Sequence, residues 1–494
     1  MASLKFSKAV ICAVLLATFG AAAPAVSSAP GATSSLAPAA SSAPGSLSAV
    51  PTSSASATPS SDARSRSSSN APSSTASAPE ASETVPYASD DPNYILWGSD
   101  YNGVPQAVRG SYGASVLGPQ DVALVKQNAD LLAPPTTDSG SVGNAKWPFS
   151  LSHNRLQTGG WARQENIGVM PLATSMAGVN MRLEAGAVRE LHWHKTAEWA
   201  YILKGSVQVT ALNSDGQNYL ATSEGDLWYF PPGIPHSLQA TADLADGAEF
   251  LLVFDDGNFS EDSTFLLTDW LAHVPKEVLA KNFQADISAF DHIPADELYI
   301  FPSSPPPDDA KAVSDPQGTV PDPFTFKLSQ VKATQLSGGT VKVVDSTTFP
   351  VSTTIAAAEV TVEPGAMREL HWHPTQDEWS FFIEGEGRVT LFASSGNART
   401  FNYQGGDIGF VPATFGHYVE NTGNTTLRFL EIFKSDRFQD ISLNQWLALT
   451  PPDLVKAHLQ LDDATIAKLS KTKPTVIGPS GGSNNSTSNS TSSH

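Results

Sequence analysis

The stretch RELHWHKTAEW, which begins at Arg189, returns almost unchanged as RELHWHPTQDEW from Arg368. Each copy contains His-Trp-His and then a glutamate, Glu198 in the first copy and Glu378 in the second. Alternate residues of a β-strand share one face, so the two histidines of each copy point the same way. The glutamate follows one residue later in the second copy, which indicates a turn or bulge before it. Each copy therefore predicts a group of metal ligands.

The two copies are part of a longer internal repeat. Gly160 and Gly339, His192 and His371, and Phe254 and Phe433 are all separated by 179 positions. A constant offset over about 95 residues indicates a duplicated domain and not a solenoid of short units.

Each repeat is dominated by patterns typical of β-strands. Short runs rich in β-branched and aromatic residues, such as EWAYILKG from Glu198 and EFLLVF from Glu249, are separated by Gly, Pro, Asn and Asp. Helical patterns are confined to the end of each repeat, at 267–283 and 443–459. The sequence therefore predicts an all-β dominated fold of two β-barrel, jelly-roll-like domains with small helical caps.

The remaining segments lie outside the two repeats. A basic start, an apolar stretch and small residues predict a signal peptide at 1–23, too short to span a membrane. We expect a disordered Ser/Ala/Pro-rich segment at 24–86 and a disordered Ser/Asn-rich tail at 473–494. The two repeat domains are then 87–300 and 301–472. The protein is expected to be secreted and extracellular, with association with a cell wall as a further possibility.

The charge of the chain limits its partners. With 29 basic and 49 acidic residues, its formal net charge is -20. It lacks the basic surface that nucleic-acid binding requires, and no later apolar run is long enough for a membrane span. N-glycosylation sequons at Asn258, Asn424 and in the C-terminal tail predict a glycoprotein.

A third histidine completes each group of candidate ligands. GDLWYFPPGIPH ends at His236, and GDIGFVPATFGH ends at His417. Three imidazoles and one carboxylate suit a divalent first-row metal with open coordination positions, and a catalytic zinc also fits this donor set. Histidines that only satisfy hydrogen bonds in a barrel are a poor explanation for two matched sets. The predicted ligands are His192, His194, Glu198 and His236 in the first repeat, and His371, His373, Glu378 and His417 in the second.

The spacing of these residues resembles the two-part signature of the cupin family. Small departures are Ala240, where the signature has Asn, and Thr414, which replaces a glycine. More narrowly, SLSHNRLQTGGWARQ from Ser150 and VNMRLEAGAVRELHWHKTAEWAYILKGSVQVTA from Val179 look like secreted fungal oxalate decarboxylases. This resemblance covers roughly residues 90–460. It implies a bicupin with two manganese ions per chain, oxalate as substrate, dioxygen as co-catalyst, and a homo-oligomer, either a trimer or a hexamer.

The first repeat has three extra residues that the second lacks, because Phe254 and Trp270 are sixteen positions apart but Phe433 and Trp446 only thirteen. By itself this insertion, within residues 255–265, fits either a lid over the site or an ordinary surface loop. The resemblance implies a lid whose Glu261 donates a proton and an Arg189 that binds and polarises oxalate. Simple strand alternation puts Glu190 on the histidine face instead, so the role of Arg189 requires a bulge.

The second repeat retains Arg368 and carries Glu431 where the first repeat has Leu252. We interpret these two residues as auxiliary groups of a structural or subsidiary site. Some relatives have a tyrosine where this chain has Phe438, so no phenol is expected there. Two alternatives to an oxalate decarboxylase remain open on the sequence: an oxalate oxidase that releases hydrogen peroxide, and a non-enzymatic storage or binding bicupin.

Overall fold

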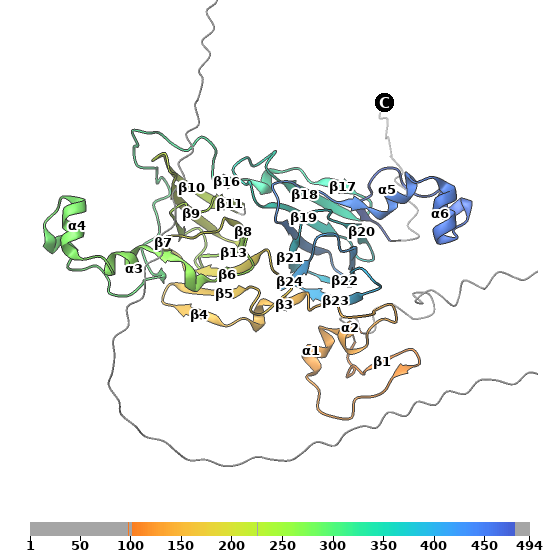
Figure 1. Ribbon diagram of the computed structural model, residues 1–494. Coiled ribbons are helices and arrows are strands. Elements are labelled where there is room, and N and C mark those ends of the chain that lie inside the picture. Colours follow the sequence, from red (N-terminus) through yellow and green to blue (C-terminus); the bar gives the residue numbers. More distant parts are fainter. Residues whose placement is uncertain (1–96, 98–100, 225, 480–494) are drawn as a thin grey trace, which may run out of the picture. The chain divides into compact units, whose positions relative to one another are not determined.

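The computed structural model describes residues 97, 101–224 and 226–479 (Figure 1). The predicted signal peptide at 1–23, the segment at 24–86 and the tail from residue 480 onward lie outside the described residues. Each repeat forms a jelly roll of two antiparallel sheets, one of seven strands and one of six. The predicted β-rich fold with two related domains is therefore confirmed.

The first jelly roll is built mainly from the first repeat. Its seven-stranded sheet has the order β16-β11-β8-β13-β6-β5-β4, and its six-stranded sheet the order β10-β9-β12-β7-β14, with β15 also paired to β7. The strands are β4 (Asn154–Gln157), β5 (Gly160–Glu165), β6 (Ala177–Leu183), β7 (Val188–Trp193), β8 (Glu198–Lys204), β9 (Ser206–Leu212), β10 (Asn218–Glu224), β11 (Leu227–Phe230), β12 (His236–Ala240), β13 (Ala248–Phe254), β14 (Phe265–Leu266) and β15 (Ile300–Phe301).

The second jelly roll repeats this plan. Its sheets have the orders β17-β18-β19-β26-β21-β24-β3 and β23-β22-β25-β20-β27, with β28 paired to β20. The strands are β17 (Thr334–Leu336), β18 (Gly339–Val344), β19 (Ala356–Val362), β20 (Met367–Trp372), β21 (Glu378–Glu384), β22 (Glu386–Phe392), β23 (Ala398–Gln404), β24 (Asp407–Val411), β25 (His417–Asn421), β26 (Leu427–Phe433), β27 (Ile441–Ser442) and β28 (Val476–Ile477).

Side-chain alternation along the strands produces three hydrophobic cores. In β8, Ala200 and Ile202 belong to the core inside the first jelly roll. Trp199 and Tyr201, on the opposite face of the same strand, belong to a core shared with the second repeat. Because both faces of β8 are buried, its central residues are apolar throughout and do not alternate with polar ones.

The two repeats exchange one short strand each. The strand β3 (Lys146–Pro148) precedes the first repeat in sequence but pairs with β24 of the second. Conversely, β16 (Thr325–Phe326) begins the second repeat but pairs with β11 of the first (Figure 1). Contacts therefore cross the sequence boundary that we placed at residues 300 and 301.

The segment before the first repeat also contacts the second jelly roll. The side chain of Asp130 is buried and accepts hydrogen bonds from Arg109, Arg388 and Asn402. This segment contains β1 (Val108–Arg109), β2 (Tyr112–Gly113), α1 (Val122–Lys126) and α2 (Ala129–Leu132).

Helices follow the last long strand of each repeat, as predicted. They are α3 (Leu267–Ala272) and α4 (Lys276–Phe283) in the first repeat, and α5 (Leu443–Ala448), α6 (Pro452–Leu459) and α7 (Asp463–Ile466) in the second. Short 3-10 helices span Phe149–Leu151, Glu261–Ser263, Ile287–Phe290 and Leu328–Gln330. Within the described part of the chain, no helix has the length and apolar character needed to cross a membrane.

The predicted C-terminal tail begins later than residue 473. Strand β28 pairs with β20, and the side chain of Val476 is fully buried in the core of the second jelly roll. The polar composition that suggested disorder belongs to the residues after this strand. A single buried valine in a short strand is too weak a signal to be distinguished from a loop in the sequence.

A buried carboxyl group lies between the two repeats. Glu165 at the end of β5 is fully buried, and the indole of Trp379 on β21 donates a hydrogen bond of 2.8 Å to it. Burial raises the pKa of Glu165 from its ordinary value of 4.5 to about 8. Between pH 4.5 and about 8 the folded protein keeps a proton on Glu165 that the unfolded chain has released. The free energy of unfolding therefore falls as the pH rises through this range.

Replacing Glu165 with glutamine should therefore remove this dependence, because glutamine still accepts from Trp379 and has no proton to lose. The unfolding free energy of Glu165→Gln relative to the wild type should grow by about 1.4 kcal/mol per pH unit between pH 5 and 8. Denaturant titrations of both proteins at several pH values measure this difference. A difference that does not change with pH would mean that Glu165 is ionised in the fold.

Candidate metal centres

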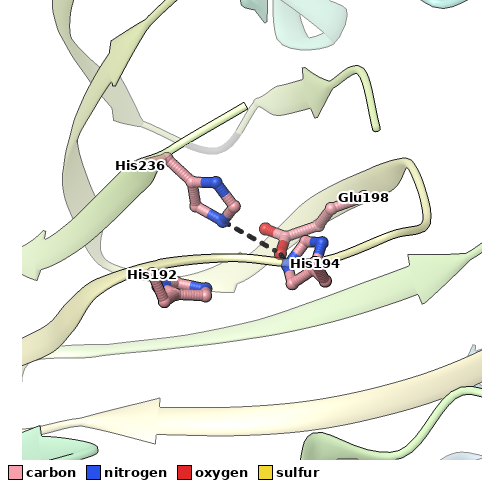
Figure 2. Close-up of side chains that lie close together, drawn as sticks. All are labelled: His192, His194, Glu198 and His236. Carbon is pink, nitrogen blue, oxygen red and sulfur yellow. Dashed lines mark hydrogen bonds and ion pairs between the residues drawn. The ribbon is translucent and has the colours of Figure 1, made fainter. Parts of the chain in front are cut away.

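The structure brings the eight predicted ligands together in two groups of four. Figure 2 shows the first group, in which His192 on β7, His194 just after it, Glu198 on β8 and His236 on β12 lie close together. In each group the four ligand atoms lie within 4.8 Å of one another, and all eight side chains are buried. The predicted turn between histidine and glutamate is present, since β7 ends at Trp193 and β8 begins at Glu198.

Hydrogen bonds to the backbone orient the imidazoles. The Nδ1 atom of His192 lies 2.5 Å from the carbonyl oxygen of Glu190, and that of His236 lies 2.8 Å from the carbonyl of Ile234. A carbonyl only accepts, so Nδ1 carries the proton and the Nε2 lone pair faces the centre of the group. The other four histidines make corresponding Nδ1 contacts: His194 to Thr196, His371 to Glu369, His373 to Gln439 and His417 to Phe415.

Several atoms that face the two centres have no hydrogen-bond partner among the described residues. They are Nε2 of His236, His371, His373 and His417, and Oε2 of Glu378. Except for His371, each of these atoms lies 3.0–3.4 Å from a ligand atom of its own group, in a contact that is not a well-formed hydrogen bond. Buried polar atoms without a partner are costly, at about 1–3 kcal/mol each. A bound cation would satisfy all of them, so this donor set fits a metal ion.

The protonation states also suit metal binding. Burial lowers the pKa of His192, His236 and His371, which favours the neutral form that ligates. Burial alone would raise the pKa of Glu198, but His236 and His194 hold it below its ordinary value, so this ligand is ionised. His373 differs, because its contact with Glu378 outweighs burial and raises its pKa.

The two ligand carboxylates receive their second hydrogen bond from different sources. In the first repeat the indole of Trp228 donates to Glu198 over 2.8 Å, and in the second the hydroxyl of Ser380 donates to Glu378 over 2.5 Å. Trp228 is paired across the strands with Ala200, whereas Ser380 is paired with Gly409. Trp228 in the first copy and Ser380 in the second thus come from different strands, but each donates a hydrogen bond to the ligand carboxylate of its own copy.

A β-bulge places Arg189 in the first site. On β7 and β12, His192 is opposite His236 and Arg189 is opposite Leu238, so three steps on β7 match two on β12. The bulge that the arginine assignment required is therefore present. The carboxylate of Glu190 accepts hydrogen bonds from the amides of Thr268 and Tyr299, so it supports the neighbouring backbone.

The segment 255–265, which we predicted to be a lid, contacts this arginine. Glu261 opens a short 3-10 helix, is 7% exposed, and lies 3.1 Å from Arg189 Nη2. The phenol of Tyr299 donates a second hydrogen bond of 2.5 Å to the same carboxylate oxygen. Phe259, also in the lid, places its ring 5.8 Å from that of His194 and stacks on Phe254. This segment therefore contacts both Arg189 and His194, and its Glu261 carboxylate is directed to the arginine.

Tyr299 was not found by sequence analysis. Its ring lies between two guanidinium groups, with Arg155 at 3.6 Å and Arg189 at 4.1 Å from its centroid. Its φ of 54° is unusual for a residue with a side chain, and it places the phenol next to the lid. Thr475 precedes the corresponding strand of the second repeat with a φ of 57°, but it has no phenol.

The arginine of the second repeat is surrounded by two carboxylates. Arg368 is fully buried and lies 3.0 Å from Glu431 and 2.7 Å from Asp440. Asp440 was also missed by sequence analysis, although its offset of 179 from Glu261 was a usable signal. Arg189 pairs with one carboxylate, Glu261, whereas Arg368 pairs with two. The additional partner is Glu431, whose position is taken by Leu252 in the first repeat.

Removing one ligand from either group should halve the metal content of the protein. We expect His192→Ala and His371→Ala each to bind one divalent metal ion per chain, while the wild type binds two. Elemental analysis after gel filtration measures this ratio. If either variant still bound two ions tightly, at least one of the proposed groups would not be a metal site.

Known proteins share both the fold and these groups. The chain matches the cupin family over residues 154–289 and 327–467. It is 54% identical over 380 residues to the oxalate decarboxylase OxdC of Bacillus subtilis, covering 76% of this chain and 97% of that protein. It is 44% identical over 350 residues to a probable oxalate decarboxylase of Arthroderma benhamiae, covering 69% of this chain and 85% of that protein.

A solved structure of Bacillus subtilis oxalate decarboxylase, studied for its Mn(II) centres, has a TM-score of 0.74 to this chain. The two are 53% identical, and the match covers 76% of this chain and all of that one. With two cupin domains and long matches to these relatives, the chain belongs to the bicupin oxalate decarboxylase family.

Proposed function

We propose that this protein is a manganese-dependent carbon–carbon lyase that converts oxalate into formate and CO2. The observation that carries the proposal is the inward-facing Glu261, held by Arg189 beside the first ligand group. The similarity to Bacillus subtilis oxalate decarboxylase over nearly the full length of that protein supports the same reaction. The two intact ligand groups argue against a non-enzymatic storage protein.

Each of the two groups would hold one manganese ion, so that a chain carries two. When bound, manganese supplies a redox-active Lewis acid with open positions for carboxylate oxygens. Three imidazoles and one carboxylate would hold each ion. Burial favours the neutral form of His192, His236 and His371, and the carboxylate of Glu198 is ionised. Dioxygen acts as a co-catalyst in this proposal.

Arg189 and Glu261 perform the chemistry that the chain itself contributes. Arg189 neutralises the charge of the oxalate dianion and orients it beside the first ligand group. Breaking the C–C bond releases CO2, and the remaining carbon must gain one proton to become formate. Glu261 donates that proton, while Phe259 and the rest of the lid exclude water.

The second ligand group is assigned a structural or subsidiary role. Arg368 is already paired with Glu431 and Asp440, so it is less available to a substrate dianion than Arg189. An oxalate oxidase, the alternative activity, would need no group placed to donate this proton. The position of Glu261 therefore favours the decarboxylase.

Substituting the proton donor tests this function directly. Glu261→Gln keeps the size of the side chain but cannot release a proton, so formate production should fall by about 10²- to 10⁴-fold. Both manganese ions should remain bound. Formate, peroxide and manganese are measured on the same samples.

The matched control is Asp440→Asn, which changes the corresponding carboxylate of the second repeat. This variant should retain most of the formate production of the wild type. Near-normal formate from Glu261→Gln would place the proton donor elsewhere, and a large loss from Asp440→Asn would make the second repeat the leading candidate.

The protein is further proposed to be a homo-oligomer, a trimer or a hexamer. Matched helices of the two repeats expose large apolar side chains, with Trp270 at 58% and Trp446 at 55% exposure. Val278 and Phe283 on α4, and Leu454 and Leu459 on α6, are exposed as well. Several exposed apolar side chains on one helix support a surface that another copy of the chain covers in an assembly.

Light scattering at micromolar concentration should therefore give a mass of at least three chains. Replacing Trp270 with serine should lower this mass, because it removes one of the largest exposed apolar side chains. A wild-type protein that is monomeric under these conditions would contradict the oligomer.

The protein is also proposed to be secreted and glycosylated. The sequons at Asn258 and Asn424 lie at exposed positions, which supports glycosylation there. Protein recovered from the culture medium with an N-terminus near residue 24 would support secretion, and retention in the cell with an intact N-terminus would contradict it.

A further inference from the structure

The lid of the first repeat is held by residues that follow one another at the end of β5. The amide of Ile167 donates to the carbonyl of Gly257 over 3.0 Å, and the side chain of Asn166 donates to the carbonyl of Phe259 over 2.9 Å. Gly257 itself lies so close to Ala173 that a Cβ atom would be 2.1 Å from its carbonyl oxygen. The base of the lid is thus tightly bound to the jelly roll.

Gln164 extends this contact to the residues that carry the proposed chemistry. Its side-chain oxygen accepts a hydrogen bond of 2.9 Å from the amide of Glu261, and its Nε2 lies 3.4 Å from the hydroxyl of Ser260. The hydroxyl of Ser152 donates to the carbonyl of Gln164 over 2.7 Å and so helps to hold this part of β5. One side-chain amide therefore contacts both residues of the Ser260–Glu261 step.

These bonds determine where the Glu261 carboxylate points. With its amide bound to Gln164, Glu261 begins the 3-10 turn with its side chain directed to Arg189 and Tyr299. Neither hydrogen bond of Gln164 involves the carboxylate, so Gln164 can act only through the backbone and Ser260. It lines a cavity of about 380 Å³ together with Glu261 and Tyr299.

The second repeat provides an internal comparison. Gly160 corresponds to Gly339, so Gln164 corresponds to Val343, whose side chain cannot form hydrogen bonds. The second repeat also lacks the three extra lid residues. The first repeat thus has both the longer lid and the side-chain amide that binds it, and the second repeat has neither.

We propose that Gln164 is a positioning residue that determines the product of the reaction by keeping the lid seated with Glu261 inward. This inference rests on the proposed function. With the lid seated, oxalate and one proton give formate and CO2. With the lid displaced, the proton is not delivered, and dioxygen as oxidant takes the two electrons: oxalate, dioxygen and two protons then give two CO2 and one hydrogen peroxide.

The test compares product ratios of the whole manganese-loaded protein. Gln164→Val introduces the residue of the second repeat and removes both hydrogen bonds. The ratio of peroxide to formate should rise by about tenfold, the change in an equilibrium that the loss of one or two neutral hydrogen bonds typically brings. Manganese content and thermal midpoint are measured alongside and should stay close to the wild type.

Two further variants make the test decisive. Gln157→Val makes the same change at the end of β4, the strand that pairs with β5, at the turn between the two strands and away from the lid. This variant should leave the product ratio unchanged. Gln164→Leu fills more of the space of the glutamine side chain than valine does and also removes both hydrogen bonds. It covers the case in which Gln164→Val folds poorly, and its ratio should also rise by about tenfold.

Unchanged product ratios in folded, manganese-loaded Gln164→Val and Gln164→Leu would overturn the inference while leaving the proposed function intact. A wild-type protein that makes no formate from oxalate would overturn the proposed function, and the inference with it. A rise in Gln157→Val equal to that in Gln164→Val would also overturn the inference, because the effect would then be general to the hairpin.

Discussion

The main constraint on this fold is the convergence of eight buried histidine and glutamate side chains. Their ligand atoms meet in two groups of four. Each imidazole donates a hydrogen bond from Nδ1 to a backbone carbonyl, and several of the Nε2 atoms lack a well-formed hydrogen bond among the described residues. Such an arrangement is costly without a cation, because each unpaired buried polar atom costs about 1–3 kcal/mol. The strand register, the turn before each glutamate and the bulge in β7 and β20 all serve to bring these atoms together.

The same bulge separates the roles of two neighbouring residues. It turns Arg189 toward the first ligand group and Glu190 toward the backbone of Thr268 and Tyr299. The second repeat has the same bulge and an equally buried arginine, but Glu431 and Asp440 both pair with it. The two copies therefore share their metal ligands and differ in what surrounds the arginine and in the length of the lid.

Patterns in the sequence predicted the ligand groups and the β-rich fold well. Strand alternation depends on neighbouring residues, and the constant offset of 179 is visible when the two copies are compared. Contacts between distant residues were harder to predict. Tyr299 reaches the lid from 38 residues away, and its position depends on a backbone angle that the sequence does not reveal. Asp440 had a usable signal in its offset from Glu261, but the insertion that follows obscured it. The pairing of β3 with the second repeat depends on packing between the two copies.

The most direct test of this account is the product balance of the purified, manganese-loaded wild-type protein with oxalate at acidic pH. Formate, CO2 and hydrogen peroxide are measured together against the oxalate consumed. The account predicts one formate and one CO2 for each oxalate, with only a small fraction of the turnover giving peroxide. Two CO2 and one peroxide for each oxalate, or no consumption of oxalate by protein with both sites filled, would contradict it.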